Sequence, residues 1–357
     1  SMLDHNADDT WELRDPHNNE VRDKVSAREL WQRIIEMRMQ TGEPYLHFID
    51  HSNKAMPDFQ KKLGLSIKQS NLCSEIILPT DKQRTAVCCL SSLNLEHYDS
   101  WKNNKLFLRD VAEMLDNVLQ YFIDNAPKTI ARAKFSAMRE RSIGIGALGW
   151  HAYLQKNMLP WESALAVSAN HRIFKHIKKK LDEANLELGT ERGEAPDAMG
   201  TGKRFSHMQA IAPNASSSIL MNNTSPSIEP YRANAYRQDT LSGAYLNKNR
   251  FLDELLKSKI AENKIDEVWS SIIANDGSVS NVDVLTDEEK DVFKTAMEID
   301  QRWVVQHAAD RQEYIDQAQS LNVFFRPDSN VKYVHAVHFQ AWKQGLKTMY
   351  YLSLIHI

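Results

Sequence analysis

The stretch from residue 85 to residue 148 decides the fold, because it predicts a strand, two helices and a second strand in succession. It begins with TAVCCLSSLNL (85–95), in which small and apolar residues are mixed without a helical period. LFLRDVAEMLDNVLQYFIDN (106–125) follows, with apolar residues at the i, i+3, i+4 and i+7 spacing of an amphipathic helix. A second helix is predicted over 129–140, and SIGIGAL (142–148) is again an apolar strand. Buried strands joined through helices lie parallel, so this stretch predicts an α/β architecture, with the strand 85–95 buried on both faces.

The same alternation continues outward in both directions. Ser26-Ala27-Arg28-Glu29 has the spacing of a capping box and predicts a helix that ends near Gly42, after a charged surface segment over 11–23. Further strands are predicted over 45–50, 208–212 and 347–352. Further helices are predicted over 161–188, 249–260, 263–274, 286–320 and 335–346, with a surface excursion at 275–287. No flexible linker divides the chain, so one domain is expected.

Composition excludes several classes of protein. The chain has 357 residues, of which 42% are hydrophobic and 25% charged, as in soluble globular proteins. Its 44 basic and 47 acidic side chains give a formal charge of -3, so no basic field for nucleic acid is expected. No run of about 18 apolar residues could span a membrane. Only three cysteines are present, which favours a reducing cytoplasm over a disulfide-stapled secreted fold.

Three chemically useful side chains alternate at Asn71, Cys73 and Glu75. In an extended segment they would share one face. A carboxylate can act as a general base, an amide can orient a substrate hydroxyl, and a thiol can serve as nucleophile, thiolate or radical carrier. A partly buried structural cysteine in an ordinary loop is the alternative that spacing leaves open.

Cys88 and Cys89 lie in the predicted strand 85–95, so their side chains point to opposite faces and at most one can face Cys73. The cysteine spacing is poor for zinc, since no second C-x-x-C or histidine pair accompanies it. Residues 144–149 match the dinucleotide fingerprint G-x-G-x-x-G, although charged residues 139–141 precede them where a buried strand should run. A tightly packed strand-to-helix turn is the alternative.

A polar turn of small residues follows the predicted strand 208–212. Free backbone N–H groups at a helix N-terminus would suit an anion there, and a plain helix cap is equally consistent. The turn consists of Pro213, Asn214, Ala215, Ser216 and Ser217.

Paired tyrosines, Tyr350 and Tyr351, close the last predicted strand. Such a pair usually belongs to the core, and a redox role requires redox partners nearby.

Taken together, these segments resemble the large, catalytic subunit of class I ribonucleotide reductase, which reduces ribonucleoside diphosphates. The matching segments, in the family's order, are 70–76, 86–95, 144–149, 213–217 and 348–351. The resemblance implies the second half of a ten-stranded α/β barrel with its central finger loop. Residues 1–352 would form this partial barrel domain, with the amino-terminal regulatory region and first barrel half absent. Residues 353–357 are expected to be a non-native tail, because 352–357 resemble a translated sequencing adapter; a split gene is the alternative.

The resemblance implies roles for the finger-loop residues. Cys73 would become the thiyl radical that removes the 3′ hydrogen of the ribose. Glu75 would take the 3′-hydroxyl proton, and Asn71 would hold the sugar hydroxyls. Cys88 would be one of two cysteines that deliver electrons and form a disulfide, whereas Cys89 receives no role.

The resemblance also implies substrate contacts and a radical path. Ser70 and the turn 213–217 would bind the substrate, the turn through its diphosphate. Tyr350 and Tyr351 would pass a radical to Cys73 from the small, metal-containing subunit, and this chain would bind no metal or cofactor itself.

The family's partners follow from the same resemblance. Thioredoxin or glutaredoxin would supply electrons, and the full-length family is a homodimer with ATP and dNTP effectors. Because the partner cysteine for Cys88 is missing, this chain alone is expected not to turn over. The remaining alternatives are half of a split enzyme, a non-catalytic interaction fragment, a glycyl-radical enzyme and a nicotinamide dehydrogenase.

Overall fold

A row of five backbone segments forms the centre of the computed structural model, which describes residues 9–240 and 243–354. Strand β4 (Leu90–Asn94) pairs in parallel with β5 (Gly144–Leu148). Beyond β5, residues 207–211 bond to both neighbours: Ile145 N donates to Met208 O at 2.7 Å, and Ile211 N donates to Ala318 O at 3.1 Å. Residues 317–325 include β8 (Val323–Phe325), which pairs in parallel with β10 (Leu352–Leu354). The predicted α/β half barrel is confirmed, and within the described residues its sheet does not close.

Two further strands, β3 (Leu46–His47) and β9 (Thr348–Met349), lie next to β10, the last segment of the row. β3 pairs antiparallel with β9, so a segment near the start of the chain lies beside its end. The tyrosines Tyr350 and Tyr351 fall between β9 and β10.

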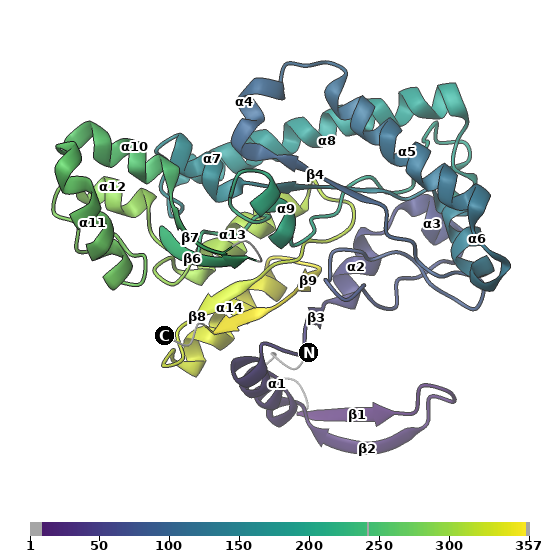
Figure 1. The fold of residues 1–357 in the computed structure, drawn as a ribbon. Coiled ribbons are helices and arrows are strands. Elements are labelled where there is room, and N and C mark those ends of the chain that lie inside the picture. The colour runs from purple at the N-terminus through teal and green to yellow at the C-terminus, as the bar shows by residue number, and fades with distance from the viewer. Residues whose placement is uncertain (1–8, 241–242, 355–357) are drawn as a thin grey trace.

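A layer of helices packs successively around the outside of the row (Figure 1). Contacts run from α5 (Phe107–Asn125) to α8 (Ala164–Arg192), then to α13 (Gln301–Gln312), α14 (Val331–Lys343) and α1 (Ala27–Thr41). Their apolar faces and the strands share one large core. The layer therefore buries one face of every strand in the row.

Two groups of elements extend away from the barrel half (Figure 1). One has its own core and comprises the hairpin β6 (Ala235–Thr240) and β7 (Gly243–Lys248) with α10 (Arg250–Lys259), α11 (Glu262–Ala274) and α12 (Asp287–Val292). The other is the hairpin β1 (Thr10–Arg14) and β2 (Val21–Ser26). The remaining helices are short, except for α6: α2 (Ile49–Ala55), α3 (Asp58–Lys62), η1 (Leu95–His97), α4 (Tyr98–Trp101), η2 (Lys128–Ile130), α6 (Ala131–Glu140), α7 (Trp150–Lys156), η3 (Pro196–Ala198) and α9 (Ala215–Leu220).

Several sequence predictions need correction. Residues 45–50 are not a strand, since only Leu46–His47 pair and α2 begins at Ile49. The helix predicted over 286–320 is two helices, because α12 ends at Val292 and Asp300 caps a new start. Residues 208–212 form only one bridge, Ile211 to Gln319, and strand 347–352 is interrupted at the tyrosines.

The structure also differs from the predictions made for the segments 11–23, 85–95 and 353–357. The charged segment 11–23 is the hairpin β1–β2. Most of β4 is only half-buried, because β5 is its one pairing neighbour among the described residues; the strand was predicted to be buried on both faces. Ser353 and Leu354, expected in a non-native tail, take part in β10, while residues 355–357 lie outside the described residues.

Gly144 and Gly146 of the fingerprint 144–149 allow neighbouring segments to pack closely against β5. A Cβ on Gly144 would lie 2.3 Å from Leu90 Cδ2. A Cβ on Gly146 would lie 2.5 Å from Ala210 O and 3.0 Å from Ile211 Cα, both backbone atoms. These glycines let the segment 207–211 approach β5, which accounts for the pattern without a dinucleotide.

We expect Gly146→Ala to lower the free energy of unfolding by about 2–3 kcal/mol, because its Cβ meets backbone that cannot move aside alone. Urea unfolding measures this change. Gly345→Ala is the control: its Cβ would meet open space, so only the strain of a φ of 81° remains, about 1 kcal/mol. Equal effects of the two substitutions would contradict the packing argument.

Four histidines are buried in the core, and burial lowers the pKa of each below its ordinary value of 6.5. The pKa falls to about 4 for His207, to about 3 for His151 and His338, and well below 6.5 for His307. The folded chain therefore binds fewer protons than the unfolded chain. Stability present above pH 6.5 is lost as the pH falls toward these lowered values.

Urea unfolding between about pH 7 and pH 5 tests this dependence. Each buried imidazole is expected to remove about 1.4 kcal/mol per pH unit below its unfolded pKa. His338→Gln keeps an acceptor for Arg38 and should flatten the pH slope, whereas His17→Gln, at an exposed position, should leave the slope unchanged. A slope that is identical in all three proteins would rule out His338 as a contributor.

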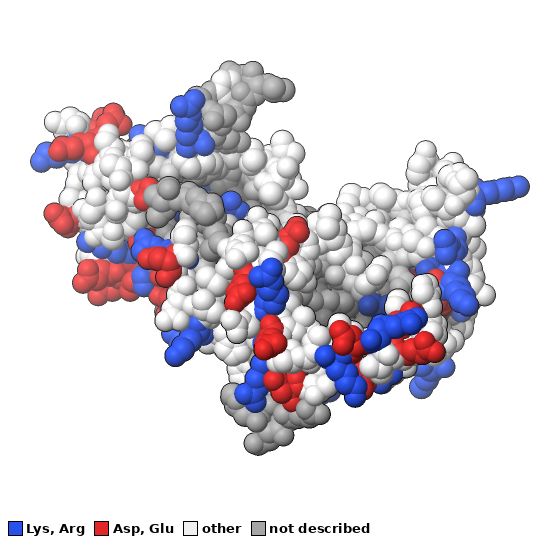
Figure 2. Space-filling view, turned by 90° about the horizontal axis from the view of Figure 1, so that it is seen from below, with Lys and Arg blue, Asp and Glu red and all other residues white. Residues whose placement is uncertain are grey.

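The surface carries both signs of charge. Figure 2 shows Lys and Arg side chains lying among Asp and Glu side chains over the face seen from below. Among the described residues, no helix is both long and apolar enough to cross a membrane.

Candidate active site

The loop that carries Cys73 is a tight turn closed by a side chain. Asn71 N donates to Ile76 O at 3.0 Å, and Ile76 N donates to Asn71 Oδ1 at 3.0 Å. Ser74 takes a left-handed φ of 70° inside this turn. The expectation that residues 71, 73 and 75 alternate along an extended face is therefore wrong, because the Asn71 amide bends the segment into a loop.

The loop is fixed to the segment 317–325 of the barrel row. Ala318 N donates to Glu75 O at 3.0 Å. The Ser320 hydroxyl donates to Cys73 O, and Ser320 Oγ also lies 3.1 Å from Glu75 Oε2. Ser74 and Glu75 are buried, at 1% and 2% exposure, while Cys73 is half-buried. The Glu75 carboxylate is thus held in place beside the thiol.

The surroundings of the Cys73 and Cys88 thiols favour the protonated form of each. Burial, followed by the Glu75 carboxylate, raises the pKa of the Cys73 thiol. Partial burial, followed by the charges of Glu75, Cys89 and Cys73, raises the pKa of Cys88 to about 12, although its side chain is open to solvent on one side. A thiol that keeps its hydrogen is a poor thiolate nucleophile and a suitable hydrogen-atom donor.

Cys89 points away from this site. Its side chain is buried and lies against helix α5, with Sγ 3.6 Å from Leu115 O. Burial, followed by the charge of Asp116, raises the pKa of Cys89 to about 11. The predicted opposite orientation of Cys88 and Cys89 is consistent with these contacts, and Cys89 packs against the helix.

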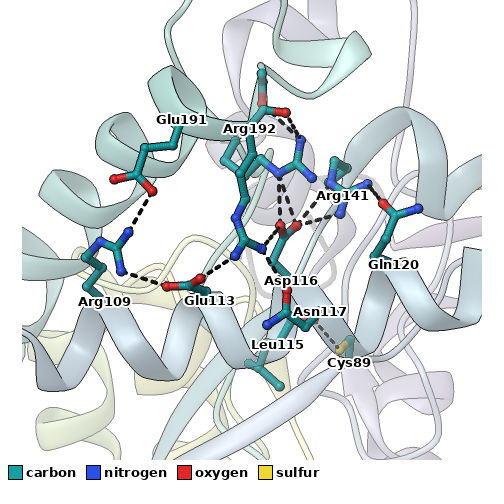
Figure 3. A network of polar contacts seen from close by, with 12 residues as sticks. Cys89, Arg109, Glu113, Leu115, Asp116, Asn117, Gln120, Arg141, Glu191 and Arg192 are labelled. Carbon is teal, nitrogen blue, oxygen red and sulfur yellow. Dashed lines mark hydrogen bonds and ion pairs between the residues drawn. The ribbon is translucent and has the colours of Figure 1, made fainter.

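A network of charges lies behind Cys89 (Figure 3). Asp116 of α5, only 1% exposed, accepts from Arg141 Nη2 at 2.5 Å, Arg192 Nη1 at 3.0 Å and Arg204 Nε at 3.1 Å. These arginines come from different parts of the chain, so Asp116 ties α5 and α8 to the ends of the strands.

The paired tyrosines reach the finger loop. Tyr350 lies next to the Cys73 thiol, close enough for each side chain to shift the pKa of the other. Burial, followed by the neighbouring Cys73 side chain, raises the pKa of Tyr350 above its ordinary value of 10. The ring centroids of Tyr350 and Tyr351 lie 6.4 Å apart, and Tyr351 is 37% exposed. The pair therefore connects an exposed surface to the Cys73 thiol.

A cavity of about 570 Å³ joins the tyrosines to the turn 213–217. Its lining includes Pro213, Ala215, Tyr350 and Tyr351. Glu229 also lines it, is only 4% exposed, and accepts from Asn322 Nδ2 at 2.5 Å. Burial raises the pKa of this carboxyl to about 7.

The turn itself is held by Asn214. This residue has a left-handed φ of 54°, and its Nδ2 donates to Ala147 O at 3.1 Å and Ala212 O at 2.9 Å. Asn214 stands at the N-cap of α9, as the plain helix cap considered from the sequence requires, but its side chain makes no capping hydrogen bond. Ala215, Ser216 and Ser217 at the start of the helix are exposed.

The structure brings together most of the predicted site. Asn71, Cys73, Glu75 and Tyr350 meet at the finger loop, and Cys88 is close enough to respond to the Glu75 charge. The Ser70 hydroxyl is used locally, since it donates to Asn71 O at 3.0 Å. In the part of the chain that the structure describes, no group of three or more His, Cys, Asp or Glu side chains could hold a metal ion.

Sequence reasoning missed four residues around this site: Tyr45, Ser320, Asn322 and Glu229. The Tyr45 ring lies 4.6 Å from the Tyr350 ring, and Asn322 Oδ1 accepts from Tyr351 N at 3.0 Å. No local pattern marks them, because each contact joins segments far apart in the chain.

Comparisons with known proteins agree with this geometry. Residues 4–201 and 195–352 match the family described as ribonucleotide reductase, barrel domain. The chain is 59% identical over 342 residues to the ribonucleoside-diphosphate reductase large subunit of Invertebrate iridescent virus 3, covering 96% of this chain and 54% of that protein. It is 33% identical over 368 residues to the Caenorhabditis elegans ribonucleoside-diphosphate reductase large subunit, covering 93% and 46%.

A solved structure shows the same fold. The Actinobacillus ureae class Id ribonucleotide reductase alpha subunit superimposes with a TM-score of 0.86 at 39% identity, covering 92% of this chain and 61% of that chain. The chain spans about half the length of the viral and nematode large subunits that it matches.

Proposed function

Since the chain belongs to the ribonucleotide reductase barrel-domain family, we propose that it carries the radical chemistry that reduces ribonucleoside diphosphates to deoxyribonucleoside diphosphates. The closeness of the Cys73 thiol to the Tyr350 side chain carries this proposal. A protonated thiol beside a phenol is the arrangement that hydrogen-atom transfer requires.

The first step forms the radical on Cys73. A metal-containing small subunit would supply a one-electron oxidant that turns Tyr351 into a phenoxyl, with its proton leaving to solvent, and this phenoxyl would take the hydroxyl hydrogen atom of Tyr350. The Tyr350 phenoxyl then takes the hydrogen atom of Cys73, so that the S–H bond breaks, a phenol O–H bond forms, and a thiyl radical remains.

The thiyl radical acts on the ribose. Cys73 removes the 3′ hydrogen, Glu75 takes the 3′-hydroxyl proton, and Asn71 holds the sugar hydroxyls. Two thiols, one of them Cys88, supply the two electrons and protons that release the 2′-hydroxyl as water, and they become a disulfide. Glu75 then returns its proton to the 3′ oxygen, and Cys73 returns its hydrogen to C3′ and is a thiyl radical again. Exclusion of solvent from a completed barrel would protect the radical from side reactions.

Substrate binding uses the cavity beside the tyrosines. Ser70 and the turn of Pro213, Asn214, Ala215, Ser216 and Ser217 would hold the substrate, the turn through its diphosphate. The exposed start of α9 supports this role, because its first backbone N–H groups are directed away from the helix.

The remaining expectations concern the larger enzyme. Thioredoxin or glutaredoxin would reduce the disulfide in the cytoplasm, and homodimerisation with ATP or dNTP regulation would belong to the full-length family. We expect this chain by itself not to turn over. Cys89 lies against Leu115 and Cys73 lies next to Tyr350, which leaves Cys88 without a partner thiol among the three cysteines.

Glu75→Gln tests the assignment of the proton acceptor. In a large subunit that contains these residues and is reconstituted with a small subunit, kcat for CDP reduction should fall by about 10²–10³-fold, because glutamine cannot accept the 3′-hydroxyl proton. KM should change little. Chromatographic measurement of dCDP gives both constants, and Glu187→Gln on the surface is the control. An unchanged kcat in Glu75→Gln would remove this carboxylate from the mechanism.

A further inference from the structure

A third tyrosine, Tyr45, lies closer to Tyr350 than Tyr351 does. The Tyr45 and Tyr350 ring centroids are 4.6 Å apart, against 6.4 Å for Tyr350 and Tyr351. The two phenols also affect each other's pKa, since Tyr45 raises the pKa of Tyr350 and Tyr350 lowers that of Tyr45. On its other side, the Tyr45 hydroxyl donates to Glu43 Oε1 at 3.1 Å. Four side chains, Cys73, Tyr350, Tyr45 and Glu43, therefore follow one another in a series of neighbours.

The position of Tyr45 is fixed by the fold. In the antiparallel register of β3 and β9, Leu46 lies opposite Met349 and His47 opposite Thr348. One further step in this register places Tyr45 opposite Tyr350.

A buried arginine holds the same two segments. Arg38 of α1 is 0% exposed, and its Nη1 donates to Pro44 O and, at 3.2 Å, to Tyr350 O. One guanidinium thus binds the backbone next to Tyr45 and the backbone of Tyr350. Register and guanidinium together set the distance between the two phenols.

The Glu43 carboxylate at the end of the series determines which hydroxyl donates and which oxygen accepts at each contact. An ionised carboxylate only accepts hydrogen bonds, so Glu43 takes the hydroxyl hydrogen of Tyr45. The Tyr45 oxygen then remains as an acceptor for the Tyr350 hydroxyl. With its own hydrogen directed to Tyr45, the Tyr350 oxygen presents a lone pair toward the Cys73 thiol. Burial, followed by the Glu43 hydrogen bond, raises the pKa of Tyr45 and keeps its phenol protonated.

We infer that Tyr45, held by Glu43, is a positioning residue that keeps the Tyr350 hydroxyl oxygen open toward the thiol of the finger loop. The inference rests on the proposed function. In that step Cys73 S–H and the Tyr350 phenoxyl become a thiyl radical and a phenol, and one hydrogen atom moves. While Tyr350 is a phenoxyl, the Tyr45 hydrogen stays with Glu43, so no second donor competes with the thiol.

The pKa of residue 350 tests this direction. 2,3,5-Trifluorotyrosine placed at position 350 of the chain ionises near neutral pH, and its phenolate absorbance can be titrated. Tyr45→Phe should lower the pKa of this residue by about one unit, because the neutral phenol loses its acceptor. Glu43→Ala, at an exposed position, should lower it too, because the freed Tyr45 hydroxyl can turn and donate to the phenolate. Tyr121→Phe, at a site 72% exposed, should leave it unchanged.

Each other outcome overturns the inference. A higher pKa in Tyr45→Phe would mean that Tyr45 donates to Tyr350. An unchanged pKa in that variant would mean that Tyr45 only packs, and an unchanged pKa in Glu43→Ala would remove the carboxylate from the series. The titration needs neither the small subunit nor turnover, so its failure is distinct from failure of the proposed reductase activity.

Discussion

A large subunit carrying Cys73→Ser is expected to lose nucleotide reduction by about 10⁴-fold or more while still binding its substrate. The reason lies in the bond that must break. An alcohol O–H bond is much stronger than a thiol S–H bond, so the Tyr350 phenoxyl cannot take the hydrogen of serine. The two side chains have nearly the same size, and the finger loop is held by backbone contacts that serine keeps. Formation of dCDP and calorimetric binding of CDP measure the two effects separately.

Cys89→Ser is the matched control for this experiment. Cys89 is buried against Leu115 O and away from the finger loop, so activity should stay near that of the unsubstituted enzyme. If Cys73→Ser retained activity within about tenfold of that enzyme, which is about 1.4 kcal/mol in the barrier, Cys73 would not be the radical carrier.

Asp116→Asn is expected to lower the free energy of unfolding by about 3–5 kcal/mol. Asp116 is 1% exposed and accepts from Arg141, Arg192 and Arg204, so its replacement by a neutral amide leaves three guanidiniums without their shared carboxylate. Burial alone raises the pKa of Asp116, but the hydrogen bonds and charges of Arg141 and Arg204 outweigh it, and the net shift is downward. This contribution is present above the unfolded pKa and is lost as the pH falls through the lowered one.

Urea unfolding of Asp116→Asn and of Glu191→Gln makes the comparison. Glu191 binds Arg109 at 2.7 Å on the same helical layer but is 51% exposed, so its substitution should change the free energy of unfolding by at most about 0.5 kcal/mol. Comparable small changes in both variants would show that burial does not strengthen the Asp116 network.

The helical layer and the parallel strands could be predicted because their signals are local. The apolar period of 106–125 and the cap at Ser26 lie within the segments that they define, and α5 and α1 follow them closely. The hairpins β1–β2 and β6–β7 could not be predicted in this way. The exposed pattern of β1 shows why, since a strand with both faces open carries no alternation of apolar residues.

The candidate site was predicted as a set of residues but not as a shape. Asn71, Cys73 and Glu75 were identified together, yet the turn depends on the Asn71 side chain bonding to Ile76 N, which spacing does not reveal. Ser320 and Tyr45 had no signal. Ser320 bonds to Cys73 O across 247 positions, and Tyr45 meets Tyr350 through the register of β3 and β9.

The pairing of β3 with β9 also sets when the site can form. It joins Leu46 to Met349, so nearly the whole chain lies in the loop that this contact closes. The entropy of closing so long a loop must be overcome before the contact contributes stability, which places it late in folding. During synthesis the finger-loop thiol therefore emerges long before the tyrosines that face it. A nascent or partly unfolded chain cannot bring the Tyr350 phenol to Cys73, and only the completed fold connects the two.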